Sequence, residues 1–231
     1  MNLLECKHLT KRFGDTAALE DVNLILPRGR IVGLLGKNGA GKTTLIKLIN
    51  DLLVPTDGQV LFEGEPLGVR SKEAIAYLPE RTYLDRSMTA AQAIKYFSTF
   101  YTSFDPQKAK ALLADLDLRE EARISTLSKG MQEKLQLILV MSRKAKLYVL
   151  DEPLGGVDPA TRDYILDTIL QNFAENASVL LSTHLIADIE RILDDVILID
   201  KGRIAETDAA DALRDREGCS IDDYFRRRFK C

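Results

Sequence analysis

Residues 31–44 read IVGLLGKNGAGKTT, a short apolar strand that ends in a glycine loop and opens an apolar helix. The loop has the spacing G-x-x-x-x-G-K-[ST], in which Gly36 and Gly41 let the backbone turn where a Cβ would clash. Consecutive N–H groups can then point at one anion, Lys42 adds a charge for the β- and γ-phosphates, and Thr43 offers a hydroxyl to Mg²⁺. We therefore expect a nucleotide triphosphate to be held by Gly36, Lys37, Asn38, Gly39, Ala40, Gly41, Lys42, Thr43 and Thr44.

The 231 residues are 45% apolar and 29% charged, which is typical of a soluble globular protein. This length suits one domain with an inserted subdomain. The longest apolar runs, residues 135–141 and 196–199, fall far short of the ~18 residues that a membrane span needs. The N-terminus lacks the pattern of a signal peptide, so the sequence predicts a cytosolic location.

The net charge of −3 argues against nucleic acid as a partner, because binding to a phosphate backbone is driven by clustered cations. The one basic cluster, Arg226–Arg228 with Lys230, is either a solvated helix face or a contact with membrane lipid or a partner. Cys6, Cys219 and Cys231 form no C-x-x-C pair, which favours reduced thiols over a zinc site.

Short strands rich in Val, Ile and Leu alternate with helical stretches, a pattern that predicts an α/β fold with a largely parallel sheet. In the first part we expect strands near residues 3–8, 22–26, 31–35 and 59–62, the last preceded by a hairpin turn at Asp57-Gly58. Hairpins so closely spaced predict a small antiparallel sheet beside the parallel one. The parallel sheet resumes with strands near 147–150, 179–181 and 196–199, and a last strand pair and two short helices close the domain.

Helices replace strands in the middle of the chain. Apolar spacing predicts a helix over 90–101, Asp105-Pro106 caps a second helix, and Ser128 begins a third. Residues 76–80 are expected to form the loop that leads into this part. We therefore expect one domain, 1–231, with a core (1–81 and 145–231) and an inserted α-helical subdomain (82–144).

Two carboxylates, Asp151 and Glu152, directly follow a buried strand, at the end where open α/β sheets place ligands. Such a pair is often only a helix cap, but after an upstream phosphate loop we interpret Asp151 as a ligand of Mg²⁺ and Glu152 as the residue that polarises the attacking water. His184 follows the next strand, and a lone histidine there is either structural or bonded to the γ-phosphate. Its place at the same sheet edge favours the phosphate, whereas His8 is expected to be structural.

Taken in chain order, five segments resemble the ATP-binding subunit of an ABC transporter: the phosphate loop, Leu127–Gln132 (LSKGMQ), the strand that ends in Asp151-Glu152, Gly156–Pro159 (GVDP) and His184. The resemblance spans essentially the whole chain. The phosphate loop occurs in many ATPases, but a Ser-x-Gly helix start at this distance before the carboxylate strand is specific to this family. The resemblance implies a RecA-like P-loop NTPase fold and a Mg²⁺-dependent ATPase whose two copies enclose two ATP molecules.

The resemblance also implies roles for residues outside the phosphate loop. Ser128 and Gly130 bind the γ-phosphate of the ATP that the facing subunit holds, through the free N–H groups and positive dipole of a helix start. Phe13 occupies the place of an aromatic residue that stacks on adenine, the alternative being a core phenylalanine. Asp158 caps the helix that begins at Pro159, and the resemblance implies that it is also one of the nucleotide-binding residues.

Three features depart from the family pattern. Lys129 and Met131 replace the usual second and last residues of the signature. Glu80 stands where glutamine is usual, and because an ionised carboxylate only accepts hydrogen bonds, we expect it at Mg²⁺ or water rather than on phosphate. Gly155 stands where serine is frequent. These variants resemble the ABC-2 type branch that exports antibiotics and peptides.

The implied partners are separate membrane (permease) subunits and a second ATPase subunit, in a homodimer or a heterodimer. The implied location is cytoplasmic, on the inner face of the cell membrane. The alternative is a soluble ABC-type ATPase that acts as a nucleotide-gated regulatory module on a non-transport partner. The long coiled coils and tandem domains of such relatives are not found in these residues. A neighbouring reading frame for a membrane protein would favour transport, and the transported substance is not specified by this chain.

Overall fold

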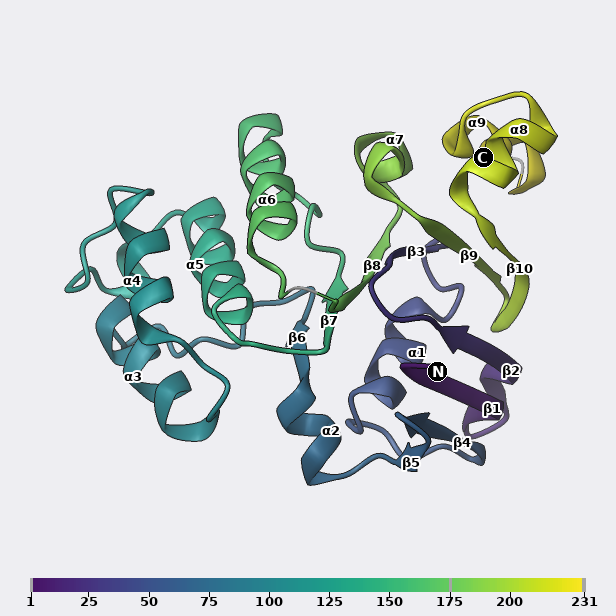
Figure 1. Cartoon of the computed structure of the whole chain (residues 1–231), viewed down its shortest axis with the longest axis horizontal. Coiled ribbons are helices and arrows are strands. Elements are labelled where there is room, and N and C mark those ends of the chain that lie inside the picture. The colour runs from purple at the N-terminus through teal and green to yellow at the C-terminus, as the bar shows by residue number, and fades with distance from the viewer. Residues whose placement is uncertain (1, 175, 230–231) are drawn as a thin grey trace.

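The computed structural model describes residues 2–174 and 176–229. Its elements are β1 (Leu4–Phe13), β2 (Thr16–Leu26), β3 (Ile31–Leu35), α1 (Lys42–Ile49), β4 (Asp57–Phe62), β5 (Glu65–Pro66), α2 (Val69–Ala74), β6 (Ile75–Leu78), α3 (Ala90–Phe100), α4 (Pro106–Ala114), α5 (Lys129–Met141), β7 (Leu147–Asp151), α6 (Pro159–Asn172), β8 (Ser178–Thr183), α7 (Ile186–Ile189), β9 (Asp195–Asp200), β10 (Arg203–Ala209), α8 (Ala210–Glu217) and α9 (Ile221–Phe229). A six-stranded sheet has the order β10-β9-β3-β8-β7-β6, and a four-stranded antiparallel sheet has the order β2-β1-β4-β5. Figure 1 shows the central sheet between the antiparallel sheet and the helices α3 to α5.

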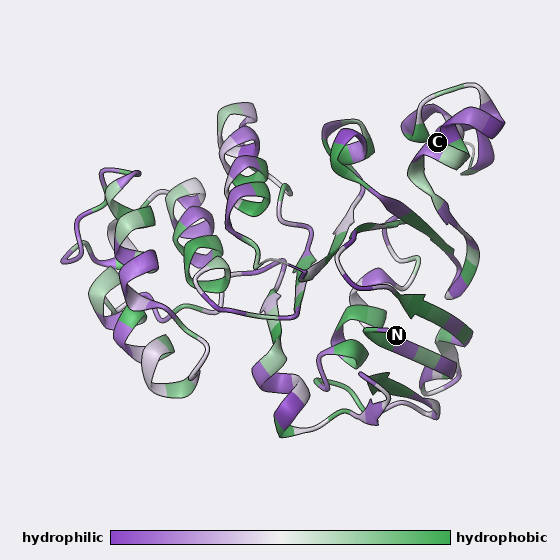
Figure 2. Ribbon diagram, in the orientation of Figure 1, coloured by the Kyte–Doolittle hydropathy of each residue, from purple (hydrophilic) through white to green (hydrophobic). Residues whose placement is uncertain are grey.

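The central strands are buried on both faces. Every residue of β3, β7 and β8 is buried, as expected for parallel strands that are covered on both sides. Successive residues of β3 alternate between two hydrophobic clusters, one shared with α1 and the antiparallel sheet and the other with α5, α6 and the C-terminal helices. Figure 2 shows hydrophobic residues along the strands and hydrophilic ones over α2 and α8. Because β3, β6, β7, β8 and β9 run parallel, their carboxyl ends meet at one edge.

The small antiparallel sheet is confirmed, but the hairpin turn expected at Asp57-Gly58 is wrong. Asp57 begins β4, which pairs with β1, and the tight turn lies one strand later, between β4 and β5. Glu63 and Gly64 form that turn with positive φ angles of 53° and 85°. Gly58 serves a different purpose, because a Cβ there would lie 2.3 Å from the carbonyl oxygen of His8. An Asp-Gly pair thus marked a close approach of two strands instead of a turn.

Strand β6 was not expected from the sequence. Residues 76–78 belong to this strand, which pairs in parallel with β7, so only Pro79 and Glu80 of the expected loop follow it. The strand has four residues and directly continues α2, without a turn residue between them. Such a short apolar stretch gives no clear period. The pairing of β6 with β7 places Glu80 at the same sheet edge as Asp151 and Glu152.

The three helices expected in the middle of the chain are confirmed. The Thr89 side chain accepts the N–H of Gln92 at the start of α3, and Asp105 accepts two N–H groups at the start of α4. The Ser128 hydroxyl accepts the N–H of Met131 at the start of α5. These helices share a hydrophobic cluster of their own, which includes Phe97 and Ile138. The helical part therefore has an interior distinct from those on the two faces of the sheet.

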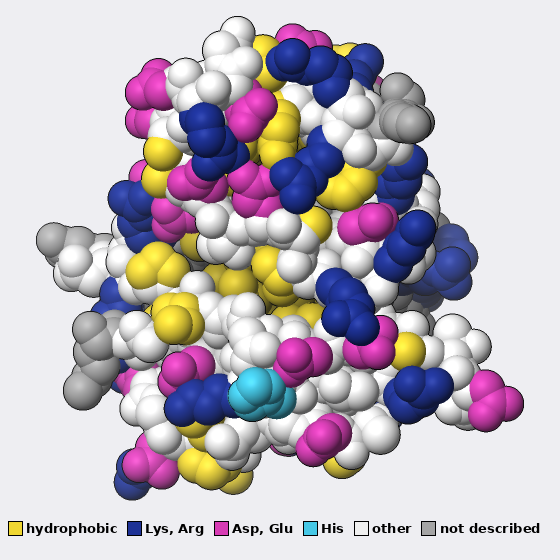
Figure 3. Space-filling model, turned by 90° about the vertical axis from the view of Figure 1, so that its right-hand side faces the viewer, with side chains coloured by type: hydrophobic (Ala, Val, Ile, Leu, Met, Phe, Trp, Pro, Cys, Tyr) yellow, Lys and Arg dark blue, Asp and Glu magenta, His cyan; other side chains and the backbone are white. Residues whose placement is uncertain are grey.

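Ion pairs fasten the C-terminal helices to the edge strand β10. Arg216 of α8 and Arg228 of α9 both pair with Glu206 of β10, whereas Arg226 pairs with Asp222 within α9. At the top of Figure 3, Lys and Arg side chains are interspersed with Asp and Glu. Arginines of the basic cluster therefore engage carboxylates of their own chain, while Lys230 and Cys231 lie outside the described residues.

Candidate functional site

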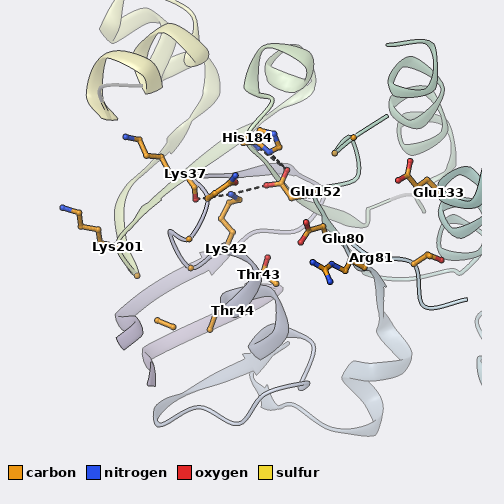
Figure 4. Close-up of a pocket in the computed structure, with 18 of the residues that line it drawn as sticks. Lys37, Lys42, Thr43, Thr44, Glu80, Arg81, Glu133, Glu152, His184 and Lys201 are labelled. Atoms are coloured by element: carbon orange, nitrogen blue, oxygen red, sulfur yellow. Dashed lines mark hydrogen bonds and ion pairs between the residues drawn. The ribbon is translucent and has the colours of Figure 1, made fainter. Parts of the chain in front are cut away.

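A cavity of about 1150 Å³ opens at the carboxyl edge of the central sheet. Figure 4 shows its wall, formed by the phosphate loop, by residues that follow β6, β7 and β8, and by the start of α5. The expected site residues that line it are Lys37, Asn38, Gly39, Gly41, Lys42, Thr43, Thr44, Glu80, Glu152 and His184. The parallel register of the sheet thus brings distant segments of the chain to one place.

The phosphate loop is packed tightly against its neighbours. A Cβ on Gly36 would lie 2.6 Å from the carbonyl oxygen of Ile199, and Gly41 has a φ of +111° with Ala18 O 2.8 Å from its Cβ position. Gly36 and the buried Ala40 therefore stand behind the loop and do not line the cavity. Lys42 is only 6% exposed, and its Nζ donates to Gly36 O at 2.8 Å. The loop thus presents its outer edge and one buried ammonium to the cavity.

Asp151 ends β7 and is buried beneath the cavity. Its Oδ1 accepts the hydroxyls of Ser182 at 2.7 Å and Thr43 at 3.4 Å, while Oδ2 is buried without a hydrogen-bond partner. Burial raises the pKa of this carboxyl above its usual value, although the two hydroxyls act in the opposite direction. An unpaired buried carboxylate oxygen beside a threonine hydroxyl suits a hard, oxygen-loving cation.

Glu152 links three parts of the site. Its Oε1 lies 3.2 Å from Lys42 Nζ, and its Oε2 lies 2.8 Å from His184 Nδ1. The backbone N–H of Glu152 donates to Ser182 O at 3.1 Å, which holds the residue at the end of β8, and its φ is +50°. Figure 4 shows Glu152 between Lys42 and His184. The side chain is therefore held at a fixed place between the phosphate loop and the histidine.

Besides Gly36 and Ala40, four further expected nucleotide-binding residues do not line this cavity. Phe13 ends β1 and is 51% exposed, so it is not a core residue, and the Lys11 ammonium lies 5.1 Å from its ring centroid. Ser128 and Gly130 lie at the start of α5, where their neighbour Lys129 lines the cavity instead. Asp158 caps α6, and its hydrogen bonds from Thr161 hold its pKa below the usual value.

Several residues of the site escaped the sequence analysis. The lining residues not singled out there are Thr16, Ala17, Ala18, Arg81, Thr82, Glu133, Lys201 and Gly202. Ser182 was missed as well, although a polar residue in an otherwise apolar strand was a usable signal. Burial raises the pKa of Glu133, whose Oε2 has no partner. His8 lies on the surface, where its Nδ1 is 2.8 Å from Asp21.

The fold and the site define a P-loop nucleotide hydrolase. The phosphate loop follows β3, and two carboxylates lie at the end of β7, which is separated from β3 in the sheet by β8. A family model described as "ABC transporter" matches residues 19–155, more than half of the chain. The chain belongs to this family and is the ATP-binding, ATP-hydrolysing subunit of an ABC transporter.

Individual relatives agree with this assignment. The Nod factor export ATP-binding protein I of Cupriavidus pinatubonensis is 32% identical over 228 residues, which are 95% of this chain and 70% of the relative. A solved ATP-binding subunit of an ABC transporter has a TM-score of 0.87 at 31% identity, covering 96% of this chain and 98% of that one. The cassette MJ0796, described as a dimer bound to ADP and Pi, shares the fold with a TM-score of 0.78 at 20% identity, covering 90% and 98%. These relatives do not favour the alternative of a soluble module on a non-transport partner.

Among the helices of residues 2–174 and 176–229, none is both long and apolar enough to pass through a bilayer.

Proposed function

We propose that the cavity is the ATP site and that hydrolysis occurs at Glu152. Lys42 and the N–H groups of residues 36–44 bind the phosphates, and His184 stabilises charge on the γ-phosphate. Glu152 orients the attacking water or accepts its proton. The water oxygen bonds to the γ-phosphorus as the bond to the bridging oxygen of ADP breaks. The observation that carries this proposal is the position of Glu152 between Lys42 and His184.

We propose Asp151, Thr43 and Glu80 as the residues that hold Mg²⁺ with the nucleotide. The support is the unpaired, buried Oδ2 of Asp151 and the Thr43 hydroxyl beside it. In the described part of the chain, no group of three or more His, Cys, Asp or Glu side chains is placed to hold a metal alone. The phosphate oxygens would therefore complete the ligand set, and the ion would neutralise charge on the β- and γ-phosphates.

We infer that two ATPase subunits close around two nucleotides, as a homodimer or a heterodimer. Ser128 and Gly130 would then bind the γ-phosphate of the facing subunit, which agrees with their position beside their own cavity instead of in its wall. Asp158 would hold the adjoining loop in place through its cap on α6, and Phe13 would stack on adenine from the cavity rim. The separate hydrophobic interior of the helices supports residues 82–144 as a subdomain that moves against the core.

A groove between the core and the helical part supports a membrane partner. It has a volume of about 460 Å³ and lies between α1, β6 and α3, with Leu52, Tyr77, Tyr83, Tyr101 and Arg143 in its wall. Leu52 is 57% exposed and Tyr83 is 48% exposed, so large apolar side chains face solvent here. Pro79 and Tyr83 of this groove flank, in the chain, Glu80 and Arg81 of the ATP cavity. We propose that an apolar segment of the permease binds in it.

We also propose export as the direction of transport and the inner face of the cell membrane as the location. The support for export is the relative named for Nod factor export, together with the Lys129 and Met131 variants of the signature. The support for the location is that the ATPase subunit must reach a membrane partner as well as cytoplasmic ATP.

Glu152→Gln tests the central assignment. The variant keeps the shape and hydrogen-bonding oxygen of the side chain but cannot accept a proton. We expect it to bind ATP, to accumulate a nucleotide-dependent dimer in size-exclusion chromatography, and to lose steady-state hydrolysis. A variant that hydrolyses ATP as fast as the parent would show that the role belongs to another residue. Glu120→Gln is the matched control, because the Glu120 side chain is 39% exposed and pairs with Lys110 away from the cavity.

A further inference from the structure

Some of the positively charged side chains in the ATP cavity form hydrogen bonds or ion pairs with the protein, and others do not. Among the described residues, Lys37, Lys42, Arg81, Lys129 and Lys201 line it. Lys42 is bound to Glu152, Lys37 donates to Phe229 O, and Lys129 pairs with Glu133 at 3.6 Å. The side chains of Arg81 and Lys201 have no hydrogen bond or ion pair within the part of the chain that the structure describes. Two cations therefore remain available for a ligand.

Arg81 is the unpartnered cation that belongs to the catalytic edge of the sheet. It comes three residues after β6, directly beyond Glu80, and shares the cavity wall with Thr43 and Glu152. Figure 4 shows its guanidinium directed into the cavity, on the side of Glu80 and Thr43. Lys201 instead lies in the turn between β9 and β10, with Gly202 and the start of β2. The two cations thus lie at different ends of the cavity.

The negative charge of the cavity favours a cation at the position of Arg81. Glu80 and Glu152 line the wall beside the phosphate loop, and the phosphates of ATP add further negative charge. Like charges so close together repel unless cations lie among them. A guanidinium stays protonated at every physiological pH, and its planar fork can donate two parallel hydrogen bonds to phosphate oxygens. Arg81 therefore provides a permanent positive charge and two hydrogen-bond donors directly beside Glu80, the carboxylate that stands where the family usually has glutamine.

We propose that Arg81 binds the γ-phosphate of ATP and stabilises the charge on it during hydrolysis, as an arginine supplied by the same chain. The inference rests on the proposed ATP site and adds a residue to it. Glu80 and Arg81 then act together: the carboxylate faces Mg²⁺ or water, and the guanidinium offsets its charge. ADP lacks the group that Arg81 binds, so the residue distinguishes ATP from ADP.

The test compares Arg81→Ala and Arg81→Lys with Arg86→Ala. Arg86 lies on the same segment, is exposed, has no side-chain partner among the described residues and does not line the cavity. Dissociation constants for ATP and for ADP are measured by calorimetry in a Glu152→Gln background, with Mg²⁺ and with EDTA. We expect Arg81→Ala to weaken ATP binding about tenfold and to leave ADP binding unchanged. Arg81→Lys should recover part of the loss, because it keeps the charge but not the planar fork.

Steady-state hydrolysis with Glu152 intact provides the second measurement. We expect kcat to fall roughly 10- to 100-fold in Arg81→Ala and to stay unchanged in Arg86→Ala. Equal losses for ATP and ADP, or an Arg81→Ala protein that behaves like Arg86→Ala, would overturn the proposal. If the parent protein binds ATP but does not hydrolyse it, the proposed catalytic role of Glu152 fails, while the ratio of ATP to ADP affinity still decides the role of Arg81.

Discussion

Glu152 Oε1 lies 3.2 Å from Lys42 Nζ, and the two side chains are 10% and 6% exposed. The residue proposed to act on water is therefore bound to the residue proposed to hold phosphate. In water such an ion pair contributes little, but here both charges have lost most of their hydration. Phosphate oxygens would compete with Glu152 for the same ammonium, so nucleotide binding would change the surroundings of both residues.

The first prediction concerns this pair. Lys42→Ala should abolish ATP binding and also lower the stability of the nucleotide-free protein by about 2–3 kcal/mol, because it leaves Glu152 buried with a weaker partner. Adding Glu152→Gln should recover most of the stability but none of the ATP binding. Urea denaturation of the single and double variants measures the first effect, and calorimetry the second. A single variant as stable as the parent would contradict the structural role of the pair.

Asp151→Asn should stabilise the nucleotide-free protein in EDTA at neutral pH, by about 1 kcal/mol. The reason is that Asp151 is buried and its Oδ2 has no hydrogen-bond partner. Replacing the carboxylate by a neutral amide therefore removes the free-energy cost of burying an uncompensated charge. The same variant should lose the rise in melting temperature that Mg²⁺ with ATP gives the parent. Thermal denaturation with and without Mg²⁺ and ATP measures both. A loss of stability in EDTA would show that the hydrogen bonds to Oδ1 of Asp151 outweigh the cost of burying its charge.

The cap of α6 predicts a pH dependence. Hydrogen bonds from Thr161 lower the pKa of Asp158, so its ionised form stabilises the folded chain above the unfolded pKa. That contribution is lost as the pH falls through the folded pKa. Asn also caps helices but carries no charge to meet the helix dipole. The melting temperature of the parent should exceed that of Asp158→Asn at pH 7, and the difference should shrink toward pH 3. A difference independent of pH would exclude the charge as its source.

Phe13→Ala should weaken ATP binding by only about fivefold, because stacking of one base contributes on the order of 1 kcal/mol or more and this ring lies outside the cavity wall. Phe13→Trp should bind ATP at least as well as the parent. Titration with a fluorescent ATP analogue measures both. Unchanged affinity in Phe13→Ala would place the base elsewhere, for example against residues 16–18 and Lys201, which line the cavity.

Leu52→Glu should prevent association with the permease while leaving ATP hydrolysis of the isolated subunit unchanged, because Leu52 lies in the apolar groove and not in the ATP cavity. Leu170→Glu is the control, since Leu170 is also exposed, at 41%, but lies on α6 outside the groove. Co-purification with the permease subunit measures the effect. Equal recovery with both variants would show that the groove is not the docking site.

Much of the fold could be predicted because its signals act over a few residues. The strand, loop and helix of residues 31–49 are contiguous, and the caps at Asp105, Ser128 and Asp158 each bond to N–H groups two or three residues ahead. Because both partners of such a contact lie within a few residues of each other, a short stretch of sequence is enough to predict these elements at their positions. The hairpin turn was misplaced because an Asp-Gly pair has the same local preferences in a turn and at a close crossing of strands.

The sequence by itself determined the phosphate loop, the order of the motifs and the chemistry that each can perform. Only the tertiary structure decided which of these side chains meet. Lys42 and Glu152 are far apart in the chain, and their 3.2 Å contact depends on the register between β3, β8 and β7. The same holds for β6, whose pairing with β7 carries Glu80 and Arg81 to the cavity. Distances between segments follow from the pairing and packing of whole strands, which no short stretch of sequence specifies.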